Sequence, residues 1–178
     1  MRHDTHVALS LNALFVLIIS MSELFGVFFK TELFIPVLLG VILGSLLPDI
    51  DEPESYIGKR LIPIAEIIGK LFGHRGASHY LIVPLCFFII ALLISGKTAL
   101  FLTGLSFGYL FHILGDLMTL GGIKGLFYPF GQKHKKYVLL PQKFRFRTNT
   151  TTENIIGGVL GITFFYQLYL IYKLGVIA

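Results

Sequence analysis

Apolar and polar positions alternate along the chain in long blocks. Five blocks are almost wholly apolar and approach the roughly 20 residues that a helix needs to cross a hydrocarbon core about 30 Å thick. They run from Val7 to Phe29, Leu33 to Leu47, Tyr80 to Ser95, Thr98 to Leu120 and Ile155 to Ile177. The second has 15 residues and would reach only about 22 Å as a helix, so it crosses with little tilt, thins the bilayer or is re-entrant. The pattern predicts an all-α, polytopic membrane protein with about five transmembrane helices.

Composition supports this interpretation and excludes an ordinary soluble domain. The chain has 178 residues, of which 54% are hydrophobic and 14% charged, and its mean hydropathy is +0.78. The first block is too long for a signal peptide and no small-residue cleavage site closes it, so we expect it to be retained. The sequence contains no internal repeat, and we expect one membrane-embedded domain over residues 1–178.

Basic residues are distributed unevenly between the two sides that five crossings would create. The amino terminus and the segments Pro48 to His79 and Gly121 to Glu153 fall on one side, and they carry 12 of the 15 Lys and Arg residues. By the positive-inside rule this side, with the amino terminus, is cytoplasmic. The same bias explains the net charge of +5, so we expect basic loops at a membrane surface and no nucleic-acid partner.

Ligand-type side chains gather at the cytoplasmic ends of the predicted spans. The single cysteine, Cys86, excludes an internal disulfide and a cysteine-based zinc site, which leaves His, Asp and Glu as ligands. We therefore predict a site for one to three divalent ions, with zinc as the expected metal. Its predicted ligands are His6, Asp49, Asp51, His74, His79, His112, Asp116 and Glu153. His3 and His134 are interpreted as ordinary terminal and loop residues.

The segment "HILGD" places His112 and Asp116 one helical turn apart. Residues at this spacing lie on one helix face about 6 Å apart, so an imidazole and a carboxylate can bind one metal ion or two adjacent ions. The alternative is a hydrogen bond along the helix face. Ionisable residues in a membrane span are costly and usually face a functional interior, which favours the metal site.

The segment "LLPDID" follows the second block. Pro48 disfavours helix at Leu47, and in an extended segment the carboxylates of Asp49 and Asp51 would point the same way. Two carboxylates held together repel unless a cation lies between them. Either aspartate can be the general base and the other a ligand; the alternative is a solvated loop that caps the next helix.

The segment "HRGASH" precedes the third block. Gly76 allows a sharp turn, and Ser78 is expected to cap a helix that begins at His79. Arg75 suits a bidentate contact with a phosphate or a carboxylate. Its alternatives are snorkelling to the interface and an ion pair with Asp49 or Asp51.

Together these motifs resemble the YdjM-like family of inner-membrane, metal-dependent hydrolases, also described as LexA-binding. The resemblance rests on "THVALS", "LLPDIDEPES", "GKRL", "FGHRGASH", "GYLFHILGDLMTLGG" and "RTNTTTE". Ser78 stands where threonine is common, and Asn149 and Thr150 depart from the Gly-Ser pattern that often precedes the glutamate at 153. The pattern of ligands is also distantly similar to that of zinc-dependent phospholipase C.

The resemblance and the residue pattern lead to one main hypothesis. It is a membrane-embedded, metal-dependent hydrolase that acts on a lipid-derived phosphoester at the cytoplasmic interface, with Asp49, Asp51 and Arg75 as catalytic residues. The basic runs "KHKKY" and "KFRFR" would attract an anionic lipid or lipid-linked phosphate. The alternatives are a metal or proton-coupled transporter and a non-catalytic regulatory membrane protein.

Overall fold

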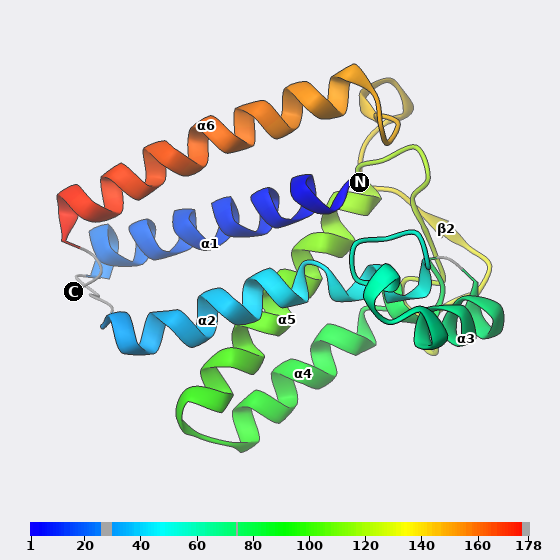
Figure 1. Cartoon of the computed structure of the whole chain (residues 1–178), viewed down its shortest axis with the longest axis horizontal. Helices are drawn as coiled ribbons and strands as arrows, with labels where there is room; N and C mark the ends of the chain where they lie inside the picture. Colours follow the sequence, from blue (N-terminus) through cyan, green and yellow to red (C-terminus); the bar gives the residue numbers. More distant parts are fainter. Residues whose placement is uncertain (26–29, 74, 176–178) are drawn as a thin grey trace.

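The computed structural model describes residues 1–25, 30–73 and 75–175, and it is mainly helical (Figure 1). The α-helices within these residues are α1 (His3–Phe25), α2 (Thr31–Gly44), α3 (Ile62–Phe72), α4 (Ile82–Leu93), α5 (Gly96–Leu117) and α6 (Thr151–Leu174). The 3-10 helices are η1 (Leu47–Asp51), η2 (Gly58–Arg60), η3 (Ala77–His79) and η4 (Gln142–Phe144). Strands β1 (Ile123–Lys124) and β2 (Lys136–Tyr137) form an antiparallel pair.

All five predicted apolar segments are helical, with changes at their ends. Four helical segments are long and apolar enough to cross a membrane: α1, α5, α6 and the stretch Thr31–Asp51, in which α2 continues through a turn into η1. Among the five predicted spans, the shortest helix is α4 rather than the second. Its 12 residues cover about 18 Å. Residues 26–29 and 176–178, where the first and fifth predicted spans end, lie outside the described residues.

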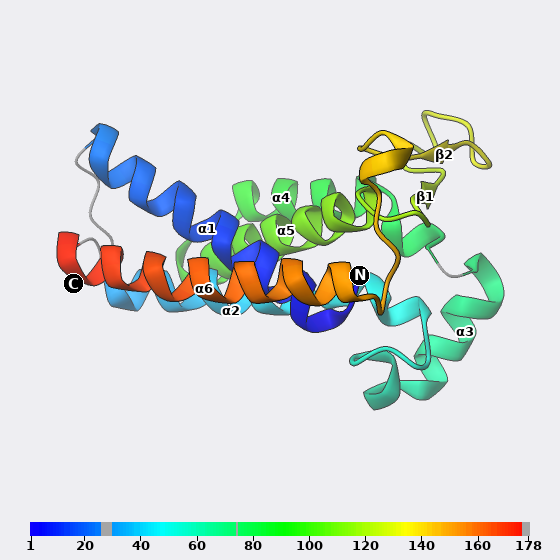
Figure 2. The same ribbon diagram turned by 90° about the horizontal axis from the view of Figure 1, so that it is seen from above.

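The five apolar helices run antiparallel in succession, so their polar ends meet (Figures 1 and 2). The starts of α1, α4 and α6 and the ends of α2 and α5 lie at one end of the bundle. Helix α3 and the two strands gather beyond the same end. This arrangement brings together the segments that the sequence analysis assigned to one side of the membrane.

Helices α2 and α5 touch backbone to backbone. A Cβ atom added at Gly40 or Gly44 of α2 would lie 2.2 or 2.1 Å from the carbonyl oxygen of Phe101 or Leu105. The contact is reciprocal, because a Cβ at Gly104 or Gly108 of α5 would lie 2.2 or 2.1 Å from a carbonyl oxygen of α2. Small residues four positions apart on both helices permit this approach, as in other membrane helix pairs.

Polar contacts join the remaining helices. The Asn12 amide of α1 donates to the Leu160 carbonyl oxygen at 2.9 Å and accepts from the Thr163 hydroxyl at 2.6 Å, which ties α1 to α6. The Ser106 hydroxyl of α5 donates to the Pro84 carbonyl oxygen of α4 at 2.7 Å. Hydrogen bonds of this kind stabilise helix pairs in a medium that offers few other partners.

The polar end of the bundle is covered by the loops. Helix α3 packs on η1, where a Cβ atom at Gly69 would lie 2.8 Å from the Asp51 carbonyl oxygen, and it exposes several large apolar side chains. The loop after α5 returns to the helix, since the Leu139 N–H donates to the Leu117 carbonyl oxygen at 2.8 Å. The ends of the spans are thus shielded by α3 and by the residues around β1 and β2.

We predict that Gly108→Ala destabilises the bundle by about 1–3 kcal/mol, because the new methyl group must separate two backbones. Thermal or denaturant unfolding in detergent would measure the effect. Gly158→Ala in α6 is the matched control, since a Cβ there meets nothing within 4 Å. Equal stability of the two variants would contradict the close α2–α5 contact.

Candidate metal centre

Four ligand-type side chains converge where α2, α4 and α5 meet at the polar end of the bundle. They are Asp49 of η1, His79 of η3, and His112 and Asp116 of α5. One ligand atom from each lies within 4.8 Å of all the others. Both histidines are fully buried and Asp116 nearly so, whereas the Asp49 side chain is 18% exposed. The predicted stacking of His112 and Asp116 on one helix face is therefore confirmed.

Two of the distances between these atoms match those around a small cation, and the third is longer. His112 Nε2 and His79 Nε2 lie 3.5 and 3.9 Å from Asp49 Oδ1, and His79 Nε2 lies 3.5 Å from Asp116 Oδ2. Ligands about 2.0–2.2 Å from a tetrahedral zinc ion are separated by roughly 3.3–3.6 Å. Two imidazole nitrogens and two carboxylates also form a donor set that suits zinc and similar divalent ions.

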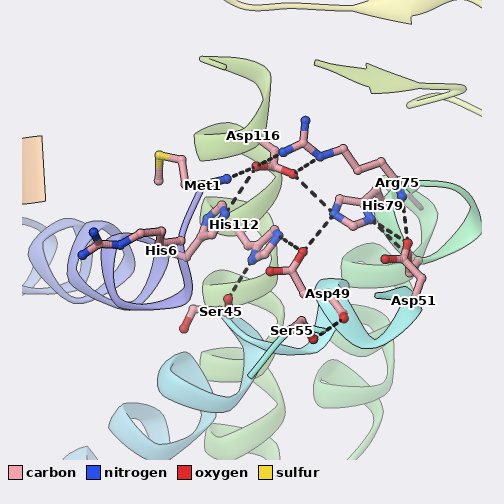
Figure 3. A network of polar contacts seen from close by, with 12 residues as sticks. Met1, His6, Ser45, Asp49, Asp51, Ser55, Arg75, His79, His112 and Asp116 are labelled. Carbon is pink, nitrogen blue, oxygen red and sulfur yellow. Dashed lines mark hydrogen bonds and ion pairs between the residues drawn. The ribbon is translucent and has the colours of Figure 1, made fainter. Parts of the chain in front are cut away.

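Each histidine ring is oriented by a contact at its other nitrogen (Figure 3). His112 Nδ1 lies 2.7 Å from the Ser45 carbonyl oxygen, which fixes that nitrogen as the donor. His79 Nδ1 lies 3.3 Å from Asp51 Oδ2. Both Nε2 atoms are thereby left to face the centre of the group. Carbonyl and carboxylate partners of this kind are usual behind metal-binding histidines.

Asp51 lies behind His79 rather than beside Asp49. Residues 47–51 form the 3-10 helix η1 and not the extended segment that we expected, so the two carboxylates diverge. Asp51 Oδ2 accepts hydrogen bonds from the Arg75 N–H at 2.9 Å and from the Ser78 hydroxyl. These contacts place Asp51 as the group that orients His79; its predicted roles as ligand or base stay predictions.

Arg75 binds the carboxylate of Asp116. Its Nε lies 2.7 Å from Asp116 Oδ2, and its Nη2 donates to Oδ1 at 2.9 Å. The ion-pair alternative named Asp49 or Asp51 as the partner of the guanidinium, whereas the partner is Asp116. The backbone at Arg75 has a φ of 59°, which turns the side chain away from the Asp51 carboxylate that its N–H contacts. Thr119 Oγ1 and the Gly122 carbonyl oxygen accept from Nη1 at 3.3 and 3.2 Å.

His6 approaches the same group from α1. Its ring stacks on that of His112, with centroids 3.6 Å apart and an interplanar angle of 7°. His6 Nε2 lies 3.3 Å from Asp116 Oδ1, which also contacts the amino nitrogen of Met1 at 2.6 Å. His6 is therefore adjacent to the four-residue group without belonging to it, and it lies on the opposite side of Asp116 from His79.

Three other sequence predictions, on Glu153, His74 and Ser78, concern residues outside the four-residue group. The Glu153 carboxylate accepts the N–H groups of Arg2 and Asn149, each at 2.7 Å, so its role as a ligand stays a prediction. His74 lies outside the described residues. The helix after "HRGASH" begins at Ile82 without a side-chain cap, so the expectation that Ser78 caps a helix at His79 is wrong.

The pKa of His79 shows that the His/Asp group favours a positive charge at this position. Burial lowers the pKa of this imidazole, but hydrogen bonds with Asp116 and Asp51 outweigh burial and raise the pKa to about 9. The ring is therefore protonated at neutral pH when no other cation neutralises the carboxylates. A histidine that binds a metal ion is neutral, so metal binding and protonation exclude each other at Nε2.

Sequence reasoning missed two residues that shape the centre. Ser45 acts through its backbone carbonyl, which side-chain chemistry cannot reveal. Thr119 joins the end of α5 to Arg75, since its hydroxyl donates to the Asp116 carbonyl oxygen at 2.7 Å. Gly104, Gly108, His112 and Asp116 follow one another at intervals of four residues. This spacing in the sequence could have indicated that their helix face contacts α2.

Comparison with known proteins identifies the family. Residues 1–176 match the family described as YdjM inner membrane protein. The chain belongs to this family. Inner membrane protein YdjM of Escherichia coli (strain K12) is 40% identical over 114 residues, which cover 57% of this chain and 54% of that protein. The protein of the same name from Shigella flexneri gives the same values, so the match spans about half the length of both relatives.

Other comparisons extend the YdjM-family match. The Bacillus subtilis (strain 168) protein YvsG is 30% identical over 142 residues, which cover 78% of this chain and 83% of that protein. No solved structure matches the chain significantly. The family description agrees with the apolar helices in placing the chain in an inner membrane, and the buried His/Asp group adds a site that could hold a metal ion.

We predict that His79→Ala and His112→Ala each remove most of the zinc from protein equilibrated with zinc and freed of excess, since each loses a predicted ligand. Asp51→Asn should keep the ion but weaken its affinity about 10–100-fold, because it disturbs only the orientation of His79. Elemental analysis and chelator competition would measure both effects. His134→Ala, in an exposed loop, is the control. Full occupancy in a His79→Ala, His112→Ala double variant would exclude this centre.

Proposed function

We propose that this YdjM-family chain is a membrane-embedded, metal-dependent hydrolase that cleaves a lipid-derived phosphoester at the cytoplasmic face of the membrane. The observation that carries the proposal is the position of Asp49. It belongs to the His/Asp group and also lines a polar cavity of about 390 Å³. A buried ligand group that opens on a polar cavity has the arrangement expected of a reaction centre rather than of a closed structural site.

The cavity carries cationic groups suited to a phosphate as well as acidic ones. Arg75, Arg2, Thr148 and Asn149 line it, and so do Glu52 and Glu54. A divalent ion in the group would supply Lewis-acid chemistry, which activates water and neutralises charge on a phosphoryl group. Zinc is the expected ion, and the donor set would hold at least one.

The chain's own residues divide the remaining tasks. Asp49, the most exposed of the four, is placed either to hold the ion or to accept a proton from water in the cavity. Arg75 holds Asp116 in position and presents positive charge at the cavity wall. Asp51 keeps His79 in the tautomer whose Nε2 faces the centre.

The distribution of buried polar groups favours hydrolysis over transport. Within the described residues, the ionisable buried side chains gather at the polar end of the bundle. Buried polar side chains further along the spans, such as Asn12, Ser106 and Gln167, are uncharged. A path for ions or protons would need ionisable or hydrated groups through the full depth of the membrane.

The proposed orientation can be tested with single cysteines in a Cys86→Ser background. Lys135→Cys lies at the polar end and Lys97→Cys in the first turn of α5 at the opposite end, and both positions are exposed. Because 12 of 15 basic residues lie on the side of Lys135, we predict that an impermeant maleimide labels Lys97→Cys in intact spheroplasts and Lys135→Cys only after lysis. Labelling of Lys135→Cys from outside would reverse the orientation.

Activity should depend on Asp49 and Arg75. We predict that Asp49→Asn and Arg75→Ala each lower hydrolysis of a phospholipid or polyprenyl phosphate at least about 100-fold in detergent, without any membrane gradient. Phosphate or headgroup release would measure the rates. Glu66→Gln, on the exposed side of α3, is the control. Gradient-dependent metal uptake by sealed vesicles, with no ester cleaved in a broad panel, would overturn the hydrolase proposal.

A further inference from the structure

A second, largely apolar groove of about 450 Å³ lies beside the polar cavity. It runs along α1, α2 and α6, and Leu11, Ile42, Leu46 and Phe164 form much of its apolar wall. These residues belong to helical segments that can cross a membrane. The groove is therefore a hydrocarbon-like surface on the membrane-embedded part of the chain.

The groove and the polar cavity meet at one pair of aromatic side chains. His3 and Tyr56 line both spaces, and their rings stack with centroids 4.9 Å apart and an interplanar angle of 19°. From this pair, one direction leads to Asp49 and Arg75 at the metal centre. The other leads to the apolar wall between α1, α2 and α6.

We propose that the groove binds the hydrocarbon chain of the substrate, with its phosphate in the polar cavity beside Asp49 and its ester linkage near the His3–Tyr56 pair. This inference rests on the proposed function and makes it more specific. It selects a phosphoester that carries a long chain over a water-soluble one of the same headgroup. The change from a polar to an apolar lining over adjoining spaces matches the two ends of such a molecule.

Gly161 provides direct access to the groove. It lines the groove on α6, and a Cβ atom added there would meet nothing within 4 Å. Gly158, almost one helical turn earlier on α6, is equally open but is not among the groove-lining residues. A large side chain at 161 should therefore fill the groove without disturbing helix packing, and the same side chain at 158 is its matched control.

The first test compares Gly161→Phe with Gly158→Phe on two phosphoesters that differ only in chain length. Burial of hydrocarbon stabilises a complex in proportion to the number of methylene groups buried, so loss of a few methylene contacts lowers kcat/KM at least about tenfold for the long-chain ester. We expect this loss in Gly161→Phe alone, with short-chain hydrolysis and zinc content within about twofold of wild type. An equal effect on both chain lengths, or in both variants, would overturn the groove assignment.

The second test needs no turnover. In a Cys86→Ser background, Gly161→Cys and Gly158→Cys are modified with N-ethylmaleimide in the presence of hexadecyl phosphate or butyl phosphate. We expect hexadecyl phosphate to slow modification of Gly161→Cys at least about fivefold and butyl phosphate to have no effect, with Gly158→Cys unchanged by either.

The two tests separate this inference from the proposed function. Protection of Gly161→Cys with no ester cleaved by wild type would support the groove as a lipid site and reject the hydrolase. Cleavage that does not depend on chain length, without protection at 161, would support the hydrolase and reject the groove.

Discussion

The contact between α2 and α5 is the constraint on which the site depends. Glycines at 40 and 44 meet glycines at 104 and 108, so the two backbones approach closely enough that only hydrogen fits between them. On α5 the same step of four residues continues to His112 and Asp116. After α2 the chain continues to Ser45, whose carbonyl oxygen lies 2.7 Å from His112 Nδ1, and then to Asp49. The register of one helix pair therefore sets the positions of three of the four candidate ligands.

Electrostatics explains why such a group is stable only as a connected network. Asp49, Asp51 and Asp116 bring three carboxylates to a largely buried region, where an unpaired charge is costly. Arg75 neutralises one of them through two contacts with Asp116. The protonated His79 or a divalent ion supplies more of the positive charge. The network thus fits a cation by the charge of its members as well as by their spacing.

The parts that sequence predicted are those governed by regular periodicity. Apolar length gave the five helices, and the step from His112 to Asp116 gave a shared face, because both follow directly from helical geometry. The parts that it could not predict depend on irregular backbone or on tertiary contact. The 3-10 turn separates Asp49 from Asp51, the positive φ of Arg75 directs it to Asp116, and Glu153 accepts N–H groups from distant segments. None of these has a local signature.

The position of the ligands along the chain also sets an order of biosynthesis. All four members of the His/Asp group precede residue 117, whereas α6 begins at Thr151. Because chains are made and inserted from the amino terminus, the ligand group can assemble while α6 is still on the ribosome. Helix α6 is made after the four ligand residues and adds Gly161 and Phe164 to the groove wall. The His/Asp group can therefore form before the apolar groove, which is complete only when α6 has been made.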